Sequence, residues 1–406
     1  MATKRKNSPL NGLLANGSMD IPFFLLLIVI VSVGLVMLFS ASYTYSYYNR
    51  DGDSTYIFRR QIIFTVLGLI GMYAVSRIRY EYFKVFAIIG VVVSVGLLLL
   101  VLVLPEYKPG FKRWINLGFT TFQPSEIAKI GLILILAFLL DKDYKGVTGK
   151  IPSKSGIAKT IYDFTDGRIV LYKSFTSVIA YGALIIVFAG LVYLENHLSG
   201  TVLMLAIGFV MLFLGEVKYK WFIAAGGVVL IAVIVLLANP SILQDYMGER
   251  ITAWLDKDFD PTGVRWQTNN SLYAIGSGGF LGTGLGQSKQ KHLYVSEPQN
   301  DFIFAIVCEE LGFIGAATII VLFALLVYRG IYIGLRAKDR FGALLSMGIA
   351  FQIGIQVALN IAVVSDLIPN TGISLPFFSA GGTSIFILLC EMGMLLSISR
   401  SMRKKG

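Results

Sequence analysis

Three carboxylates stand in the first part of a long apolar stretch that begins at residue 301. Asp301 opens the stretch, and Glu309 and Glu310 follow about two helical turns further on. A charge in hydrocarbon is costly, so such residues usually face a cavity, a partner or a substrate. A carboxylate at a partly dry boundary can act as a general base when its pKa is raised toward neutrality. Asp301 is therefore the candidate catalytic residue, although its position also suits an acid that stabilises a helix N-terminus.

Basic residues precede this candidate base. Lys289 and Lys291 follow a glycine-rich loop, G-S-G-G-F-L-G-T-G-L-G, shortly before Asp301. Cations beside a boundary carboxylate can stabilise a negative charge that develops during a reaction. We therefore predict that Lys289 and Lys291 help to bind a charged substrate that arrives from the bilayer.

A second polar group lies in the N-terminal third of the chain. Gln123, Glu126 and Lys129 share one helix face because they are spaced three residues apart. Either Glu126 and Lys129 neutralise each other, or Lys129 meets a lipid phosphate. Just upstream, Arg113 can bind an anionic headgroup while Trp114 packs on a sugar or an acyl chain, although an interfacial Trp is often only an anchor.

Glu309 and Glu310 are expected to have a structural role and not a catalytic one. Adjacent residues on a helix point about 100° apart, so at most one of them faces the same side as Asp301. We expect a structural ion pair with a neighbouring span, and Lys129 is the candidate partner. The residue spacings typical of a metal site are missing from the sequence, and both cysteines fall in apolar stretches as small packing residues.

The elements that must position these side chains are membrane helices. Hydrophobic residues make up 55% of the 406 residues and charged residues only 15%, against roughly 25% in soluble domains. Runs of about 20 apolar residues can cross a bilayer as helices, whereas a β-barrel would show short alternating segments. The sequence therefore predicts an all-α, polytopic membrane protein with ten transmembrane helices. They are expected at residues 20–42, 58–76, 84–104, 124–140, 175–194, 198–217, 221–239, 301–327, 341–364 and 382–398.

An even number of spans puts both chain ends on one side of the membrane. The segments on that side hold roughly twice as many Lys and Arg residues as those on the other side, which predicts cytoplasmic N and C termini. The expected organisation is a cytoplasmic tail (1–19), a single membrane domain (20–398) with extracellular loops (105–123 and 240–300, the latter between spans seven and eight) and a cytoplasmic loop (141–173), and a second cytoplasmic tail (399–406).

The composition also excludes some classes of function. The formal charge of +11 reflects basic inner loops that face anionic lipid, and the sequence contains no nucleic-acid-binding motif. It also lacks the G-x-x-x-x-G-K-[ST] phosphate loop, which disfavours a reaction driven directly by ATP. The loop 240–300 is too aromatic for a linker, and residues 267–277 within it suit a short helix at the membrane interface.

Several motifs, taken in order, resemble those of the SEDS family of polytopic bacterial membrane proteins, which includes RodA, FtsW and SpoVE. The matching stretches are K-R-W-I-N-L-G (112–118), F-Q-P-S-E-I-A-K (122–129), L-S-G-T (198–201), S-L-Y-A-I-G-S-G-G-F-L-G-T-G-L-G (271–286), N-D-F-I-F-A-I-V-C-E-E-L-G (300–312), T-G-I-S-L-P-F (371–377), S-A-G-G-T-S (379–384) and I-S-R (398–400). Each motif alone is weak, but the ordered set extends over nearly the whole chain.

This resemblance implies a peptidoglycan glycosyltransferase of the bacterial cytoplasmic membrane that serves cell elongation, division or sporulation. The substrate would be lipid II, a disaccharide-peptide on undecaprenyl diphosphate, and the partner a class B penicillin-binding protein. The family's essential acid falls on Asp301. Its R-W pair falls on Arg113 and Trp114, and its P-S-E-x-A-K motif places Glu126 and Lys129 in the site.

The chain departs from the family pattern at three places. Asn300 replaces a common Thr before the acid, and Ala380 replaces an aromatic residue in the S-Y-G-G-S-S turn. The common P-D-L-G-T reads N-H-L-S-G-T, so neither Asn196 nor His197 supplies a carboxylate there. This last change weakens any scheme that needs a second acid near span six; a lone His197 is most simply a hydrogen-bonded turn residue.

These residues suggest an inverting glycosyl transfer at the outer face of the membrane. Asp301 would accept the proton of an attacking sugar hydroxyl, and Arg113, Lys129 and the lysines near residue 290 would stabilise the leaving diphosphate. The sequence assigns no cofactor; a divalent cation, Mg²⁺ or Mn²⁺, is compatible with the reaction. Two alternatives are a flippase for the same lipid, which needs polar residues in the inner half-spans too, and a non-catalytic scaffold for a partner polymerase, which would tolerate loss of Asp301.

Overall fold

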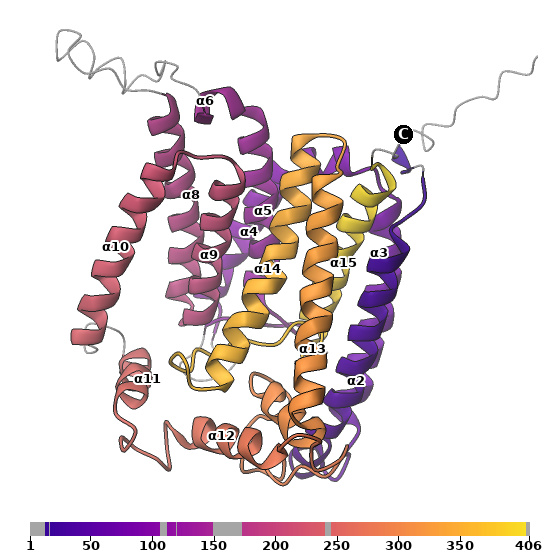
Figure 1. The fold of residues 1–406 in the computed structure, drawn as a ribbon, viewed down its shortest axis with the longest axis vertical. Helices are drawn as coiled ribbons and strands as arrows, with labels where there is room; N and C mark the ends of the chain where they lie inside the picture. Colours follow the sequence, from indigo (N-terminus) through magenta and orange to yellow (C-terminus); the bar gives the residue numbers. More distant parts are fainter. Residues whose placement is uncertain are drawn as a thin grey trace, which may run out of the picture.

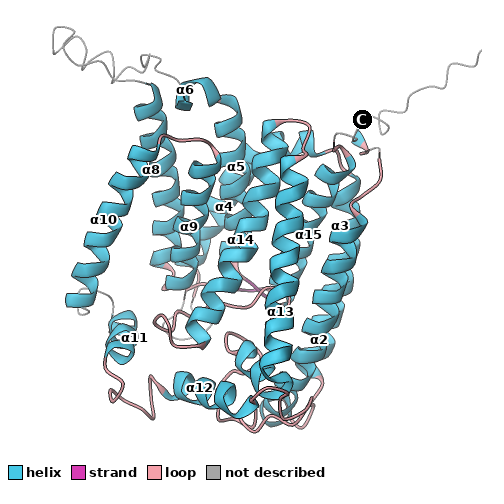
Figure 2. Cartoon of the chain, in the orientation of Figure 1, coloured by secondary structure: helices cyan, strands magenta, loops and turns pink. Residues whose placement is uncertain are grey.

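The computed structural model describes residues 13–15, 17–105, 112–118, 120–148, 173–239 and 245–402. Long helices run side by side as a bundle (Figure 1), and helix dominates the described chain (Figure 2). The long helices are α2 (Ile21–Asn49), α3 (Tyr56–Arg77), α4 (Phe83–Val103), α5 (Pro124–Lys142), α8 (Lys173–Leu194), α9 (Leu198–Leu214), α10 (Tyr219–Ala238), α13 (Ile303–Leu335), α14 (Arg340–Val364) and α15 (Gly382–Arg400). Every predicted span coincides with one of these helices, so the all-α fold is confirmed.

Seven helical segments within the described ranges are long and apolar enough to cross a membrane. They are α2, α3, α4 together with the short 3₁₀ helix η1 (Tyr80–Tyr82), α8, α13, α14 and α15. Large apolar side chains also cover the outside of the bundle: Val92 is 68% exposed, Ile186 66% and Ile231 64%. A surface of this kind suits contact with acyl chains and would be unfavourable in water.

Both ends of the described chain lie at the same end of the bundle, at the top of Figure 1. The guanidinium of Arg400 donates a hydrogen bond to the carbonyl of Gly17 (2.9 Å). Asp20, which caps the start of α2, forms an ion pair with Arg329 near the end of α13 (2.9 Å). This arrangement is what an even number of crossings produces.

Shorter elements cover the opposite end of the bundle. Helices α11 (Asp245–Leu255) and α12 (Trp266–Gly278) lie across it between α10 and α13 (Figure 1). The strands β1 (Ile115–Asn116) and β2 (Thr121–Phe122) pair as an antiparallel hairpin just before α5. The predicted short helix at 267–277 is thus present as α12. The short helix α6 (Tyr144–Thr148) follows α5 at the other end.

Parts of several predicted loops and tails lie outside the described residues. These are 1–12 and 16 of the N-terminal tail, 106–111 and 119 of the loop 105–123, 149–172 of the loop 141–173, 240–244 of the loop 240–300, and 403–406 of the C-terminal tail.

The N-terminal part of α13 is joined to the glycine-rich loop by backbone hydrogen bonds. The helix is broken at Gly312, where φ is +66°. At the break, the amide of Thr283 donates to the carbonyl of Glu309 (2.9 Å), which the interrupted helix would otherwise leave without a partner. Gly282, with φ +80°, lies so close that a Cβ there would overlap the carbonyl of Glu310. The glycines therefore allow the loop to fix the helix segment that follows Asp301.

This close approach predicts that Gly282→Ala destabilises the protein. A non-glycine residue with positive φ costs about 1–2 kcal/mol, and overlap with a fixed carbonyl adds about 1–3 kcal/mol. Gly286→Ala is the matched control, because Gly286 also has a positive φ (+81°) but faces open space. We expect thermal unfolding in detergent to show a larger drop in Tm for Gly282→Ala. Equal drops for the two variants would contradict the close contact.

Candidate active site

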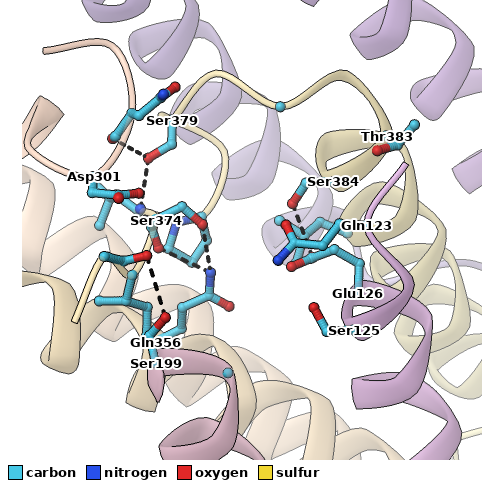
Figure 3. A pocket seen from close by; sticks show the side chains of 18 of the residues that line it. Gln123, Ser125, Glu126, Ser199, Asp301, Gln356, Ser374, Ser379, Thr383 and Ser384 are labelled. Carbon is cyan, nitrogen blue, oxygen red and sulfur yellow. Dashed lines mark hydrogen bonds between the residues drawn. The ribbon is translucent and has the colours of Figure 1, made fainter. Parts of the chain in front are cut away.

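A polar cavity of about 300 Å³ opens between α5, α9, α14, α15 and the loop that connects the last two helices (Figure 3). It brings together five of the predicted site residues: Arg113, Trp114, Glu126, Lys129 and Asp301. The other polar residues that line it are Thr121, Gln123, Ser125, His197, Ser199, Glu297, Asn300, Gln356, Ser374, Ser379, Thr383 and Ser384. Figure 3 shows Asp301 on one side of the cavity and Glu126 on the other.

Asp301 stands just before α13, in a turn whose backbone is held on both sides. Its carbonyl accepts a hydrogen bond from Asn360 (2.8 Å), and the carbonyl of Asn300 accepts one from Ser379 (2.8 Å). Its carboxylate lies against Gly372, where φ is +73° and an added Cβ would come within 3.1 Å of Oδ2. A glycine at this position thus leaves room for the acid and permits the loop conformation beside it.

Lys129 and Glu126 form an ion pair on the opposite wall. The ammonium lies 3.0 Å from the carboxylate of Glu126, and both side chains are almost fully buried. Glu126 also accepts a hydrogen bond from Ser384 (3.0 Å), and Lys129 donates to the side-chain oxygen of Gln356 (3.3 Å). An ammonium has three N–H donors. Because its contacts with the described residues use two of them, the third is available to an anion in the cavity.

Arg113 and Trp114 lie together at the cavity wall. The guanidinium carbon of Arg113 is 4.2 Å from the centroid of the indole ring, a cation–π distance. Arg113 also lines a side pocket of about 30 Å³ that it shares with Asp301 and Arg250. The Arg250 guanidinium donates to the carbonyl of Asn370 (2.7 Å), which fixes it to the loop beside Asp301. The motifs did not indicate Arg250, because nothing in its local sequence ties it to a residue 51 positions away.

His197 is part of the cavity wall, which the prediction of a simple turn residue did not anticipate. Its Nδ1 atom lies 3.4 Å from the amide nitrogen of Gln123 and 3.5 Å from the hydroxyl of Ser125. Burial lowers the pKa of His197 well below its usual value, and the positive charges of Arg113 and Lys129 lower it further. The imidazole is therefore neutral at physiological pH.

Glu195 is a buried acid in the turn between α8 and α9. Burial raises the pKa of Glu195 to about 9, although the nearby positive charge of Arg113 acts in the opposite direction. Both carboxyl oxygens are buried, and neither has a hydrogen-bond partner within the described ranges. Glu195 is therefore protonated at neutral pH, and the cation of Arg113 is not neutralised by it.

Lys289, Lys291, Glu309 and Glu310 form a separate cluster and do not line the cavity. The Lys291 ammonium pairs with Glu310 (2.8 Å) and donates to Ser40 (3.0 Å). Lys129 was therefore the wrong partner, since the loop that carries Lys291 folds back onto α13. Glu309 accepts from the backbone amide of Lys289 (2.8 Å), whose side chain is exposed. The structural role expected for the two glutamates fits this arrangement.

The sequence does contain a pattern that points to one further cavity residue, Gln356, and to the buried Asn360 behind the wall. Gln356 and Asn360 are one helical turn apart on α14, and both are buried. A pair of amide side chains at this spacing within a predicted span is a polar stripe, which in a membrane usually faces other protein groups. The stripe could have indicated the cavity, but not which loop it contacts.

The buried Lys291–Glu310 pair predicts a test of its structural role. Lys291→Met leaves the Glu310 carboxylate buried without its counter-charge, a change that costs about 3–5 kcal/mol. The double variant Lys291→Met/Glu310→Gln removes both charges and is expected to recover most of the loss. Thermal unfolding in detergent measures both. A Lys291→Met protein as stable as the wild type would contradict a structural role for the ion pair.

The buried acid predicts a pH-dependent stability. A glutamate in the unfolded chain ionises near its usual pKa of 4.5, whereas Glu195 in the folded chain keeps its proton up to about 9. As the pH rises between these values, the unfolded state loses a proton that the folded state retains, so stability falls. Glu195→Gln removes this loss. We expect its Tm to exceed that of the wild type at pH 8 and the difference to shrink at pH 5; a difference independent of pH would contradict the assignment.

Comparisons with known proteins agree with this geometry. The family model described as "Cell cycle protein", for FtsW, RodA and SpoVE, matches residues 20–404. Stage V sporulation protein E of Bacillus subtilis is 36% identical over 403 residues, which are 99% of this chain and 100% of that protein. A probable peptidoglycan glycosyltransferase FtsW of Trichlorobacter lovleyi is 34% identical over 95% of this chain and 94% of its own length.

Solved structures share the fold. A chain of a peptidoglycan synthase complex, studied for the coordination of polymerization and crosslinking, matches with a TM-score of 0.71 and 26% identity over 95% of this chain and 99% of that one. The rod shape determining protein RodA of Thermus thermophilus matches with a TM-score of 0.64 and 24% identity over 95% and 98% of the two chains. Because the family model extends over nearly the whole chain, the protein belongs to the FtsW/RodA/SpoVE family, the SEDS proteins that its motifs indicated.

Proposed function

We propose that this protein is a peptidoglycan glycosyltransferase of the bacterial cytoplasmic membrane that polymerises lipid II. Several relatives are named as probable peptidoglycan glycosyltransferases. The observation that carries the proposal is that Asp301 and Lys129 line one cavity, although they belong to distant parts of the sequence. A carboxylate and a cation that face one cavity are the groups that a glycosyl transfer with a diphosphate leaving group requires.

The proposed topology has ten spans, with both chain ends in the cytoplasm and the cavity near the outer face. The ten helices and the shared location of both described ends support it. The excess of Lys and Arg in the sequence segments that this topology puts on the inner side supports this orientation. Helices α11 and α12 would then lie in the extracellular loop between spans seven and eight.

In the proposed reaction, the 4-hydroxyl of the acceptor sugar attacks the anomeric carbon of the donor. Asp301 accepts the hydroxyl proton as the new glycosidic bond forms and the bond to the lipid diphosphate breaks. Lys129 and Arg113 stabilise the charge on the departing diphosphate, the effect that is usually largest in such reactions. Trp114 provides an apolar face for a sugar. A cavity of about 300 Å³ is at the lower end of the size range of ligand sites, so the lipid tail and the peptide would lie outside it.

Binding of a divalent metal ion in the cavity is a further part of the proposal. The described residues contain no group of three or more His, Cys, Asp or Glu side chains that could hold one. Mg²⁺ needs only one or two carboxylates when substrate phosphates supply further oxygens. Asp301 and Glu297 both line the cavity and could hold such an ion, which would supply additional positive charge to the diphosphate.

We also propose a crosslinking partner, a class B penicillin-binding protein. The structural neighbour with a TM-score of 0.71 is part of a synthase complex whose study concerns polymerization and crosslinking together. A partner of this kind would use the glycan strands as soon as they leave the cavity.

The proposed function predicts that Asp301→Asn and Asp301→Ala abolish polymerisation of purified lipid II. Loss of a general base typically lowers a rate by about 10²–10⁴-fold. The glycan products can be separated on a gel, with the protein alone and with its partner.

Asp53→Asn is the matched control for this test. Asp53 lies in the loop between α2 and α3, where it contacts Thr55 and Arg59 and does not line the cavity. We expect normal activity from it. Near-normal polymerisation by either Asp301 variant would remove the residue from the base role and favour the scaffold. Transport of lipid II by a wild-type protein that forms no polymer would favour the flippase.

A further inference from the structure

Two buried amide side chains on α14 connect the walls of the cavity. Gln356 is 2% exposed and Asn360 is fully buried. They are one helical turn apart, so they point to the same side of the helix. Neither side chain has a chemical role in the proposed reaction. Their hydrogen bonds go to the two reactive residues, Asp301 and Lys129, and to the loop beside them.

Asn360 binds two separate segments with one nitrogen atom. Its Nδ2 donates to the carbonyl of Asp301 at 2.8 Å and to the carbonyl of Ile373 at 2.7 Å. An amide nitrogen carries two hydrogens, so both are used. The turn that carries the candidate base is thereby tied to the loop before α15, at the residue next to Gly372, against which the Asp301 carboxylate lies.

Gln356 makes the corresponding connection for the cation. Its Oε1 accepts from the ammonium of Lys129 at 3.3 Å. Its Nε2 donates to the carbonyl of Ser374 at 3.0 Å and to the Ser374 hydroxyl at 3.3 Å. Figure 3 shows this amide beside Ser374 and Asp301 in the cavity wall. The side chain thus ties the cation to the residue that directly follows Ile373.

The two amides therefore link the base and the cation, through hydrogen bonds, to the same short loop segment, residues 373–374. Four residues of an α-helix rise about 6 Å, and this fixed step separates the two attachment points on α14. Packing alone would not require both side chains to bond to the same loop. A misplacement of about 1 Å in an active site can lower a rate about 10²-fold, so such a link has a direct chemical consequence.

We propose that Asn360 and Gln356 are positioning residues that set the separation between Asp301 and Lys129. This inference rests on the proposed function for its kinetic consequences. Neither side chain takes part in bond making or proton transfer; they act through Asp301, Lys129 and the loop 373–374.

The test compares Asn360→Leu with Ser346→Ala. Leucine approximates the shape of asparagine but donates no hydrogen bond. Ser346 is also buried on α14, and the one hydrogen bond of its hydroxyl within the described residues goes to the carbonyl of Gly330 (2.9 Å), which does not line the cavity. We expect Asn360→Leu to lower kcat for lipid II polymerisation about 10–100-fold with little change in KM, while Ser346→Ala keeps the wild-type kcat. Wild-type kcat in Asn360→Leu, beside an inactive Asp301→Asn, would overturn the positioning role and leave the proposed function intact.

Gln356→Glu separates the two bonds of the second amide. The new carboxylate still accepts from Lys129 but donates nothing to Ser374, and it adds a negative charge beside the cation, so kcat should fall for both reasons. A Gln356→Glu protein with wild-type kcat would contradict the link to the loop.

Hydrogen exchange provides a readout that does not require activity. Peptides that contain residues 301–303 and 372–375 should exchange at least 10-fold faster in Asn360→Leu than in Ser346→Ala, with the rest of α14 unchanged. Equal exchange in the two variants would overturn the inference even if the protein had a different activity.

Discussion

The structure depends on a lysine ammonium held in the interior of an apolar helix bundle. A buried charge is tolerated only with a counter-charge and hydrogen-bond acceptors around it. Lys129 on α5 obtains them from Glu126 on its own helix and from Gln356 on α14, while Ser384 at the start of α15 completes the shell around Glu126. The contacts of this one ion pair therefore connect three helices at a common point, and the polar cavity lies where they meet.

The loop between α14 and α15 connects this cation to the acid. Its residues receive hydrogen bonds from Gln356 and Asn360, and the loop's Ser379 donates to the carbonyl that precedes Asp301. Asp301 itself lies at the start of a helix that is broken at Gly312 and fixed by the glycine-rich loop. The base is thus attached to two loops and not to the middle of a continuous helix, which allows its position to be set by the cavity wall.

Much of this arrangement could be predicted from the sequence, and the reasons for the remainder are physical. Apolar run length indicated every long helix, because the bilayer thickness fixes how many residues a span needs. The motifs placed Arg113, Glu126, Lys129 and Asp301 in one site, and the cavity contains them all. The prediction that Lys129 pairs with Glu310 was wrong. The actual partner, Lys291, depends on how its loop folds back onto α13, and sequence spacing does not encode that. The hydrogen bonds of Asn360 could not be predicted from the sequence, because their acceptors are backbone carbonyls, which every residue has.

The central claim is that Asp301 and the cations on the opposite wall act on one substrate in one cavity. A structure of the protein with bound lipid II tests it most directly. The account predicts the acceptor sugar's 4-hydroxyl within hydrogen-bond distance of the Asp301 carboxylate, and the donor diphosphate in contact with Lys129 and Arg113. A diphosphate bound elsewhere, with no sugar hydroxyl near Asp301, would contradict it.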